Sequence, residues 1–193
     1  MNRLCVFCGS SPGHNPVYAA LATQLGQALA QRGIGLVYGG GRVGLMGVLA
    51  DATLAAGGEV IGVIPKALMD RELGHGGATE LRVVDSMHER KALMAELADG
   101  FVALPGGIGT LEEIFEVWTW AQLGIHRKPC GLLDVNGFFA PLVGFLDQVV
   151  ANGFLSPAAR AMLTVAQSTD ELFAQLSAYK APAVQKWVTS AQS

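Results

Sequence analysis

One glycine-rich segment of this sequence combines a turn suited to anions with a carboxylate suited to catalysis. The turn from Pro105 to Thr110 contains three glycines and is followed by Glu113. Glycine lets main-chain N–H groups approach a phosphate closely, and the positive end of a helix dipole favours an anion. The turn lacks the lysine of a Walker A loop, so the sequence predicts phosphate binding without nucleoside-triphosphate hydrolysis.

Glu113 has a structural and a chemical interpretation. The pattern Thr110-x-x-Glu113 matches a capping box, in which the glutamate only satisfies the start of a helix. The helical period instead aligns Glu113 with Val117 and Trp120, so its side chain leans inward. An inward carboxylate near a bound sugar would stabilise positive charge or orient a water molecule. Both interpretations remain open at this point.

Arg90 is a cation on the apolar side of its predicted helix. Positions 90, 93, 94 and 97 form one helical stripe, and the other three are Leu93, Met94 and Leu97. An arginine in such a place needs an anion, and in the first turn its charge also opposes the helix dipole. Either a structural ion pair, with Glu113 as one partner, or a bound ligand explains it.

The elements that position these residues follow an α/β alternation. The pattern predicts a single-domain, Rossmann-like, doubly wound parallel sheet with helices on both faces, over residues 1–181, and a polar tail over 182–193. The expected strands are 4–8, 34–38, 60–64, 81–85, 101–104, 130–135 and 164–166. The expected helices are 16–31, 45–56, 66–73, 87–98 and 111–123, with two more after residue 135. In such a sheet Arg90 and Glu113 both lie near the rim formed by the carboxyl ends of the strands.

A second glycine turn, from Gly39 to Gly44, matches the G-x-G-x-x-G fingerprint of dinucleotide-binding folds. Glu59 lies at about the right distance along the chain for the ribose-binding acid. However, it opens the next strand, which places it about 20 Å away at the opposite rim. A dinucleotide-dependent oxidoreductase is therefore disfavoured. We expect Gly40 and Gly41 to contact an anion or a ribose instead.

Composition excludes several classes of protein. The 193 residues are 51% hydrophobic and 15% charged, with a net charge of −3, which is typical of neither a disordered chain nor a nucleic-acid binder. No apolar stretch approaches the ~18 residues of a membrane span. Three cysteines without an export signal predict a reduced, cytoplasmic protein. Cys5 and Cys8 fall on opposite faces of a strand, so we expect core packing and no metal site.

The two motifs together resemble a known family. Met87-His88-Glu89-Arg90-Lys91, with the turn that leads to Glu113, is similar to the MHxRK and PGGxGTxxE motifs of the LOG proteins, the cytokinin-activating phosphoribohydrolases. The similarity runs from Cys8 to Gly124. It implies cleavage of the N-glycosidic bond of N6-modified adenosine 5′-monophosphates, and often of AMP, to a free base and ribose 5-phosphate. It also implies a homodimer without metal or redox cofactor.

The resemblance implies that Arg90 and Glu113 are catalytic. It assigns substrate contacts to Ser10, Gly40, Gly41, Glu72, Met87, Lys91, Gly106, Gly107, Ile108, Gly109, Thr110, Leu111, Glu112 and Thr119. Ile108 stands where the family more often has tyrosine. Phe115, Trp118 and Trp120, on a helix that is apolar on more than one side, support the dimer.

Two other functions are weighed beside this one. Such sequences have also carried the label lysine decarboxylase. That activity requires a Schiff-base lysine, and of the five lysines we expect only Lys91 near the rim. A non-catalytic carrier on the same scaffold would bind an adenylate or a pterin phosphate without cleaving it. A product assay for ribose 5-phosphate separates a carrier from a hydrolase.

Overall fold

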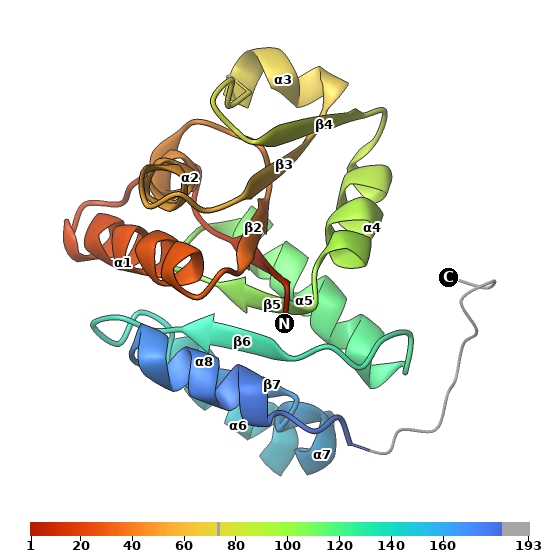
Figure 1. Cartoon of the computed structure of the whole chain (residues 1–193). Helices are drawn as coiled ribbons and strands as arrows, with labels where there is room; N and C mark the ends of the chain where they lie inside the picture. Colours follow the sequence, from red (N-terminus) through yellow and green to blue (C-terminus); the bar gives the residue numbers. More distant parts are fainter. Residues whose placement is uncertain (73, 183–193) are drawn as a thin grey trace.

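The seven strands among the residues that the structure describes join in one parallel sheet with the order β4-β3-β2-β1-β5-β6-β7 (Figure 1). The computed structural model describes residues 1–72 and 74–182, without the side chains of residues 70–72. Of the predicted tail, 182–193, residues 183–193 lie outside the described residues. The chain starts in the centre, builds one half of the sheet and then returns to build the other. This is the doubly wound arrangement predicted from the sequence.

The elements have the following bounds. The strands are β1 (Arg3–Phe7), β2 (Gly35–Tyr38), β3 (Val60–Pro65), β4 (Glu80–Val84), β5 (Gly100–Ala103), β6 (Cys130–Leu133) and β7 (Leu163–Ala166). The helices are α1 (Val17–Gln31), α2 (Gly44–Ala55), α3 (Lys66–Glu72), α4 (Met87–Leu97), α5 (Ile108–Gln122), α6 (Ala140–Ala151), α7 (Pro157–Arg160) and α8 (Thr169–Ala178). The predicted elements are present within a few residues. The two helices expected after residue 135 are present as α6 and α7, before β7, whereas α8, after β7, was not predicted.

Alternation along the central strand separates two hydrophobic clusters. Leu4 and Val6 pack with α1, α2 and α8, whereas Cys5 and Phe7 pack with α4, α5 and α6 on the other face. Cys8 belongs to the first cluster, so Cys5 and Cys8 face opposite sides, as predicted. Both thiols are free, and burial raises their pKa values above the ordinary range. Core packing therefore accounts for this pair.

Helix α4 begins with a capping box formed by Ser86 and Glu89. The Ser86 hydroxyl accepts a hydrogen bond from the Glu89 N–H at 3.1 Å, and the Glu89 carboxylate accepts one from the Asp85 N–H at 2.8 Å. These bonds satisfy donors that have no partner within the helix. They fix the first turn of α4, which carries Arg90.

Helix α5 begins three residues earlier than predicted. Its N-cap is Gly107, so Thr110 lies inside the first turn and does not cap the helix. The capping interpretation of Thr110 and Glu113 is therefore wrong. The physical reason lies in the turn itself: Thr110 is buried beneath Gly106, where an added Cβ would collide with the Thr110 hydroxyl oxygen.

The point where the winding reverses lies between β1 and β5. Their carboxyl ends are in direct contact, because the Gly9 N–H donates to the Pro105 carbonyl at 3.1 Å. A Cβ on Gly106 would also meet the Gly9 nitrogen at 2.8 Å, so glycine permits this approach. The chain leaves β1 toward one face and β5 toward the other. Ligands of doubly wound sheets bind in the crevice that this divergence opens.

Candidate functional site

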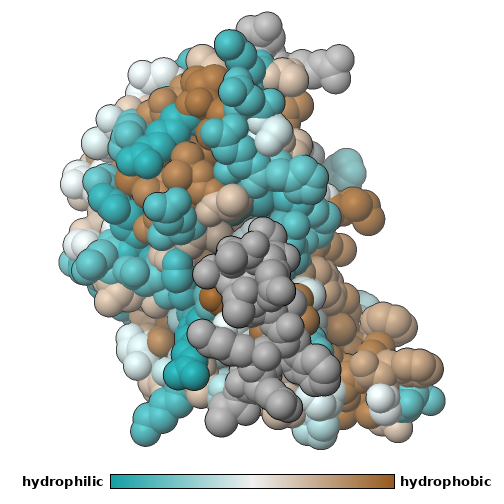
Figure 2. Space-filling model, turned by 90° about the vertical axis from the view of Figure 1, so that its right-hand side faces the viewer, coloured by the Kyte–Doolittle hydropathy of each residue, from teal (hydrophilic) through white to brown (hydrophobic). Residues whose placement is uncertain are grey.

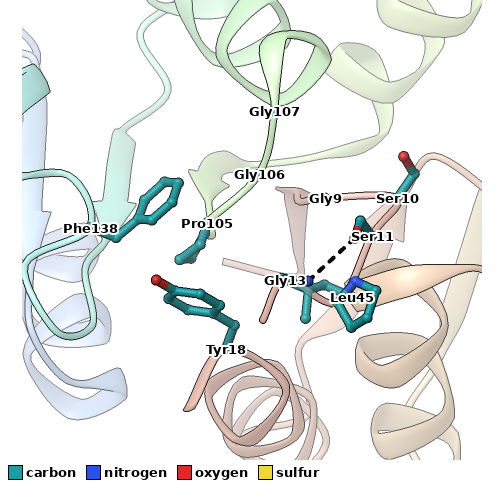
Figure 3. Close-up of a pocket in the computed structure, with 11 residues that line it drawn as sticks. Gly9, Ser10, Ser11, Gly13, Tyr18, Leu45, Pro105, Gly106, Gly107 and Phe138 are labelled. Carbon is teal, nitrogen blue, oxygen red and sulfur yellow. Dashed lines mark hydrogen bonds between the residues drawn. The ribbon is translucent and has the colours of Figure 1, made fainter. Parts of the chain in front are cut away.

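A cavity of about 260 Å³ opens at this divergence (Figure 3). It lies between the backbone that follows β1 and the turn that follows β5. In Figure 3 the Tyr18 and Phe138 rings lie on one side, next to Pro105, and their centroids are 5.7 Å apart in an edge-to-face contact. The lining residues are Gly9, Ser10, Ser11, Pro12, Gly13, Tyr18, Leu45, Pro105, Gly106, Gly107 and Phe138. Three residues predicted to contact the substrate, Ser10, Gly106 and Gly107, thus share one cavity.

The first turn of α5 presents open backbone to the outside. Gly107, Ile108 and Gly109 are exposed, and Ile108 reaches 83% exposure. A Cβ at Gly107 or Gly109 would meet nothing within 4 Å, so packing within the chain does not require glycine at either position. Small residues here leave N–H groups at a helix N-terminus accessible. This arrangement suits a phosphate.

Arg90 is buried, as its place on the apolar stripe predicts, with 5% exposure. Its Nη2 donates to the Gly39 carbonyl at 3.0 Å, and its Nη1 lies 3.8 Å from the Met87 sulfur. A Cβ on Gly39 would collide with Nη2. The glycine turn from Gly39 to Gly44 therefore accommodates Arg90. The sequence does not predict this contact, because 51 residues separate the two positions and no local signal links them.

A neighbouring loop contacts the rest of the turn from Gly39 to Gly44. Gly40 has a left-handed φ of 77°, its carbonyl accepts from the His75 N–H at 3.0 Å, and Gly41 pairs with Gly74. The buried His75 ring also lies 3.0 Å from an Asp51 carboxylate oxygen on α2. This contact is a further feature that the sequence does not predict, since an isolated histidine carries no signal for its partner.

The dinucleotide interpretation fails at the position of its acid. Glu59 pairs with Arg3, the first residue of β1, at 3.0 Å, so it lies at the amino edge of the sheet. That is the rim opposite the glycine turns. The predicted position of Glu59 at the opposite rim, which disfavoured an oxidoreductase, is therefore confirmed.

Glu113 is half-buried on α5. Its charge and that of Arg90 both act on the buried thiol of Cys5 in β1. Burial is the main cause of the raised pKa of Cys5; the Glu113 charge raises it further, and the Arg90 charge opposes this shift. The fold thus brings the two predicted catalytic residues toward one strand. Neither lines the cavity of Figure 3, whose helical residues, Tyr18 and Leu45, belong to α1 and α2.

Lys91 and Glu112, both predicted to contact the substrate, contact each other. The Lys91 ammonium lies 2.6 Å from a Glu112 oxygen and 3.0 Å from a Glu116 oxygen. Burial lowers the pKa of Lys91, but the hydrogen bonds and charges of the two carboxylates outweigh burial and leave it raised. Lys91 is therefore held in its charged form.

The remaining predicted contacts are not all at the rim, since Thr119 lies near the end of α5, about three turns from the start of that helix. Met87 is 41% exposed beside Arg90, and Leu111 is half-buried in the first turn of α5. The Thr119 hydroxyl donates to the Phe115 carbonyl of its own helix at 2.7 Å. Glu72 ends α3, and its side chain lies outside the described residues.

Two features are absent from the described part of the chain. No group of three histidine, cysteine, aspartate or glutamate side chains there is placed to hold a metal ion. Within the same residues, no helix has both the length and the apolar character needed to cross a membrane.

An all-parallel, doubly wound sheet with a cavity at its winding reversal defines the class of Rossmann-like α/β proteins. A family model described as "Possible lysine decarboxylase" matches residues 46–176. The cytokinin riboside 5′-monophosphate phosphoribohydrolase LOG7 of Arabidopsis thaliana is 54% identical over 178 residues, which cover 92% of this chain and 82% of that protein. The probable cytokinin riboside 5′-monophosphate phosphoribohydrolase LOGL5 of Oryza sativa subsp. japonica is 53% identical over 93% of this chain and 73% of that protein. The chain belongs to the LOG family, as the motifs predicted.

Solved structures confirm the fold class. The molybdenum cofactor carrier protein of Chlamydomonas reinhardtii matches with a TM-score of 0.70 and 22% identity, over 92% of this chain and 99% of that one. At this identity the similarity concerns the fold alone. The two proteins therefore share a Rossmann-like sheet with flanking helices.

The lysine decarboxylase label finds little support in the described lysines. A Schiff base forms from a neutral amine, whereas the raised pKa keeps Lys91 charged between two carboxylates. Lys66 also lies at the carboxyl end of β3, so the expectation that only Lys91 is near this rim is wrong. The expected bounds already imply this position, since the helix expected at 66–73 follows directly on the strand expected at 60–64.

Proposed function

We propose that this chain is a phosphoribohydrolase of adenosine 5′-monophosphates that carry an N6 substituent, such as isopentenyladenosine monophosphate, and of AMP. The products are the free base and ribose 5-phosphate. The observation that carries the proposal is a buried Arg90 and a half-buried Glu113 on two helices that start at the same rim as an open glycine turn. More than 50% identity to relatives with this printed activity supports it.

The 5′-phosphate is proposed to bind at the first turn of α5. The exposed backbone of Gly107, Ile108 and Gly109 offers N–H donors there, at the positive end of the helix dipole. The adjoining cavity gives room for part of the nucleotide. Binding energy from the phosphate, which does not react, would hold the glycosidic bond in place.

Glu113 and Arg90 are proposed to act on opposite charges that develop as the bond breaks. The anomeric carbon becomes positive in an oxocarbenium-like transition state, which the Glu113 carboxylate stabilises while it orients the attacking water. The water oxygen bonds to the anomeric carbon, the electron pair of the broken bond goes to the purine, and a proton from the water ends on the base. The Arg90 guanidinium holds the substrate and stabilises the departing purine.

A panel of nucleotides tests this proposal. Adenosine, AMP and their N6-isopentenyl derivatives, each with and without the 5′-phosphate, are incubated with the protein. Free base and ribose 5-phosphate are then measured. We expect equal amounts of both products from the 5′-monophosphates and little base from the nucleosides. Tight binding without either product would favour a carrier instead.

A homodimer in the cytoplasm is a further proposal. Trp118, which the sequence offered in support of the dimer, does not reach the surface: it is 5% exposed, and its indole N–H donates to the Ala159 carbonyl at 2.9 Å. Better support comes from Phe145 on α6 and Phe154 beyond it, with 60% and 88% exposure. Figure 2 shows hydrophobic surface at its lower right, at the level of α6 and α7 in Figure 1.

A further inference from the structure

An ion-pair cluster joins α4 to α5 directly beside the two proposed catalytic residues. Lys91 follows Arg90 on α4, and Glu112 precedes Glu113 on α5. The Lys91 ammonium bridges Glu112 at 2.6 Å and Glu116 at 3.0 Å. We call Lys91, Glu112 and Glu116 the Lys91 bridge. The bridge links the two helices within one turn of the proposed chemistry.

We propose that Glu116, acting through Lys91, is a positioning residue that holds Arg90 and Glu113 in the relative placement the reaction needs. The inference rests on the proposed function and adds to it. The sequence resemblance gives Glu116 no role and assigns Lys91 to substrate contact. In the structure the ammonium of Lys91 is already engaged by two carboxylates.

The sheet alone does not fix how α4 lies relative to α5. Arg90 is tied to Gly39 at the end of β2, whereas Glu113 belongs to the helix that follows β5. Strands β2 and β5 do not pair, because β1 lies between them. The two residues are therefore positioned from different strands. A direct link between the helices reduces the freedom that remains.

Charge and burial make this link sensitive to substitution. The side chains of Lys91 and Glu116 are only 11% and 24% exposed, so solvent screens this pair less than a surface pair. Glu112 and Glu116 lie four residues apart on one helix face, where like charges repel, and the ammonium between them compensates. Removing Lys91 leaves Glu116 partly buried without this cation, and removing Glu116 leaves Lys91 with Glu112 as the remaining carboxylate of the bridge.

Kinetics separate a positioning role from a substrate contact. A lysine that bound the 5′-phosphate would, once replaced, raise KM for 5′-monophosphates. A lysine that positions the helices would leave KM nearly unchanged and lower kcat, because a displacement of about 1 Å at a reacting centre costs on the order of a hundredfold in rate. Glu116 offers the sharper test, since a carboxylate is not expected to bind a phosphate.

The experiment compares Lys91→Met, Glu116→Gln and the double variant with the unmodified protein, using N6-isopentenyladenosine monophosphate. We expect each single change to lower kcat about tenfold with KM within about twofold. The double variant should be no worse than the poorer single one, because both changes remove one interaction. The swap Lys91→Glu with Glu116→Lys keeps one cation between two carboxylates and should recover most of the loss. Glu96→Gln, an exposed change on α4 outside the bridge, is the control.

Four results would overturn the proposal. These are normal kcat in Glu116→Gln, a tenfold rise of KM in Lys91→Met alone, additive losses in the double variant, and a swap that recovers nothing. Rates are given per folded molecule, with folding checked by circular dichroism. Hydrogen exchange without substrate provides a second measurement: faster exchange at the start of α4 and α5 in both single variants is expected, and unchanged exchange contradicts the bridge. If the unmodified protein releases no base, the proposed function fails, while hydrogen exchange still tests the bridge.

Discussion

A buried arginine dictates which residues can surround it. Arg90 lies in an apolar layer with Leu93 and Met94 beside it on α4, so its charge must be met by oriented acceptors. The Gly39 carbonyl is one of them, and only a residue without a Cβ allows Nη2 to reach it. Gly39 has no left-handed φ, so this close approach alone explains glycine at the position.

Gly39→Ala should therefore displace Arg90 and lower activity. The new Cβ would occupy the place of Nη2, and we expect a fall in kcat/KM of about a hundredfold, the cost of misplacing a reacting group by about 1 Å. Base release at several substrate concentrations measures it. Gly76→Ala is a matched control, because a Cβ there meets nothing within 4 Å and the φ is not left-handed. Equal activity in both variants would contradict this role of Gly39.

At the residue scale, the sequence predicts which side chains are unusual but not what they contact. The helical period placed Arg90 on a buried stripe, and its burial is confirmed. Its contact with Gly39 spans 51 residues, and the contacts of His75 and Glu116 likewise join separate elements. Such partners depend on how the elements pack, which no local pattern contains.

At the scale of elements, α4 and α8 start with the same device. Ser86 and Glu89 cap α4, and Ser168 and Glu171 cap α8, each with the serine accepting from the glutamate N–H and the carboxylate reaching back to the chain. Of these two helices, only α4 carries a proposed catalytic residue. The two helices therefore provide a natural comparison between stability and function.

Ser86→Ala and Ser168→Ala should destabilise the protein equally but differ in activity. Loss of a serine cap costs about 1 kcal/mol, which lowers Tm by about 2–4 °C in a chain of this size. We expect only Ser86→Ala to reduce kcat, by about threefold or more, because the first turn of α4 positions Arg90. Thermal unfolding and base release are measured on both. The same loss of activity in both variants would mean that stability alone is responsible.

Element boundaries were predictable where local signals agreed. Ser86, which caps α4, and Gly33, which follows α1, are such signals. The expected bounds 87–98 and 16–31 agree with these two helices to within one residue. At α5 two signals competed, since both Gly107 and Thr110 suit a helix start, and Gly107 is the cap. Thr110 is excluded because its side chain packs beneath Gly106, a tertiary contact that the sequence does not show.

At the scale of the whole molecule, the doubly wound topology was predictable because strands and helices alternate throughout. The observed strand order is of this doubly wound type and places both motifs at one rim. The surface proposed for a second copy differs from the one that the sequence indicated. The sequence pointed to α5, whose Trp118 is buried, whereas the exposed aromatic side chains Phe145 and Phe154 lie on α6 and in the segment after it.

Replacing these exposed aromatics should separate the proposed dimer. We expect the unmodified protein to have twice the 20.2 kDa chain mass by light scattering, and Phe145→Asp with Phe154→Asp to have the single mass. Charges on an apolar contact surface are costly to bury without partners. Val83→Asp, at a 47% exposed position on the edge strand β4, is the control and should keep the double mass. A dimer that survives the paired change but not the control would place the interface elsewhere.

The most direct test of the central claim is base release from N6-isopentenyladenosine monophosphate by the Glu113→Gln variant. We expect the unmodified protein to give free base and ribose 5-phosphate in equal amounts, and Glu113→Gln to lose about 10²–10⁴-fold in kcat while it still binds the nucleotide. Glu96→Gln, an exposed change on α4, should keep normal turnover. Turnover within about twofold of normal in folded Glu113→Gln, or binding without ribose 5-phosphate by the unmodified protein, would contradict the account.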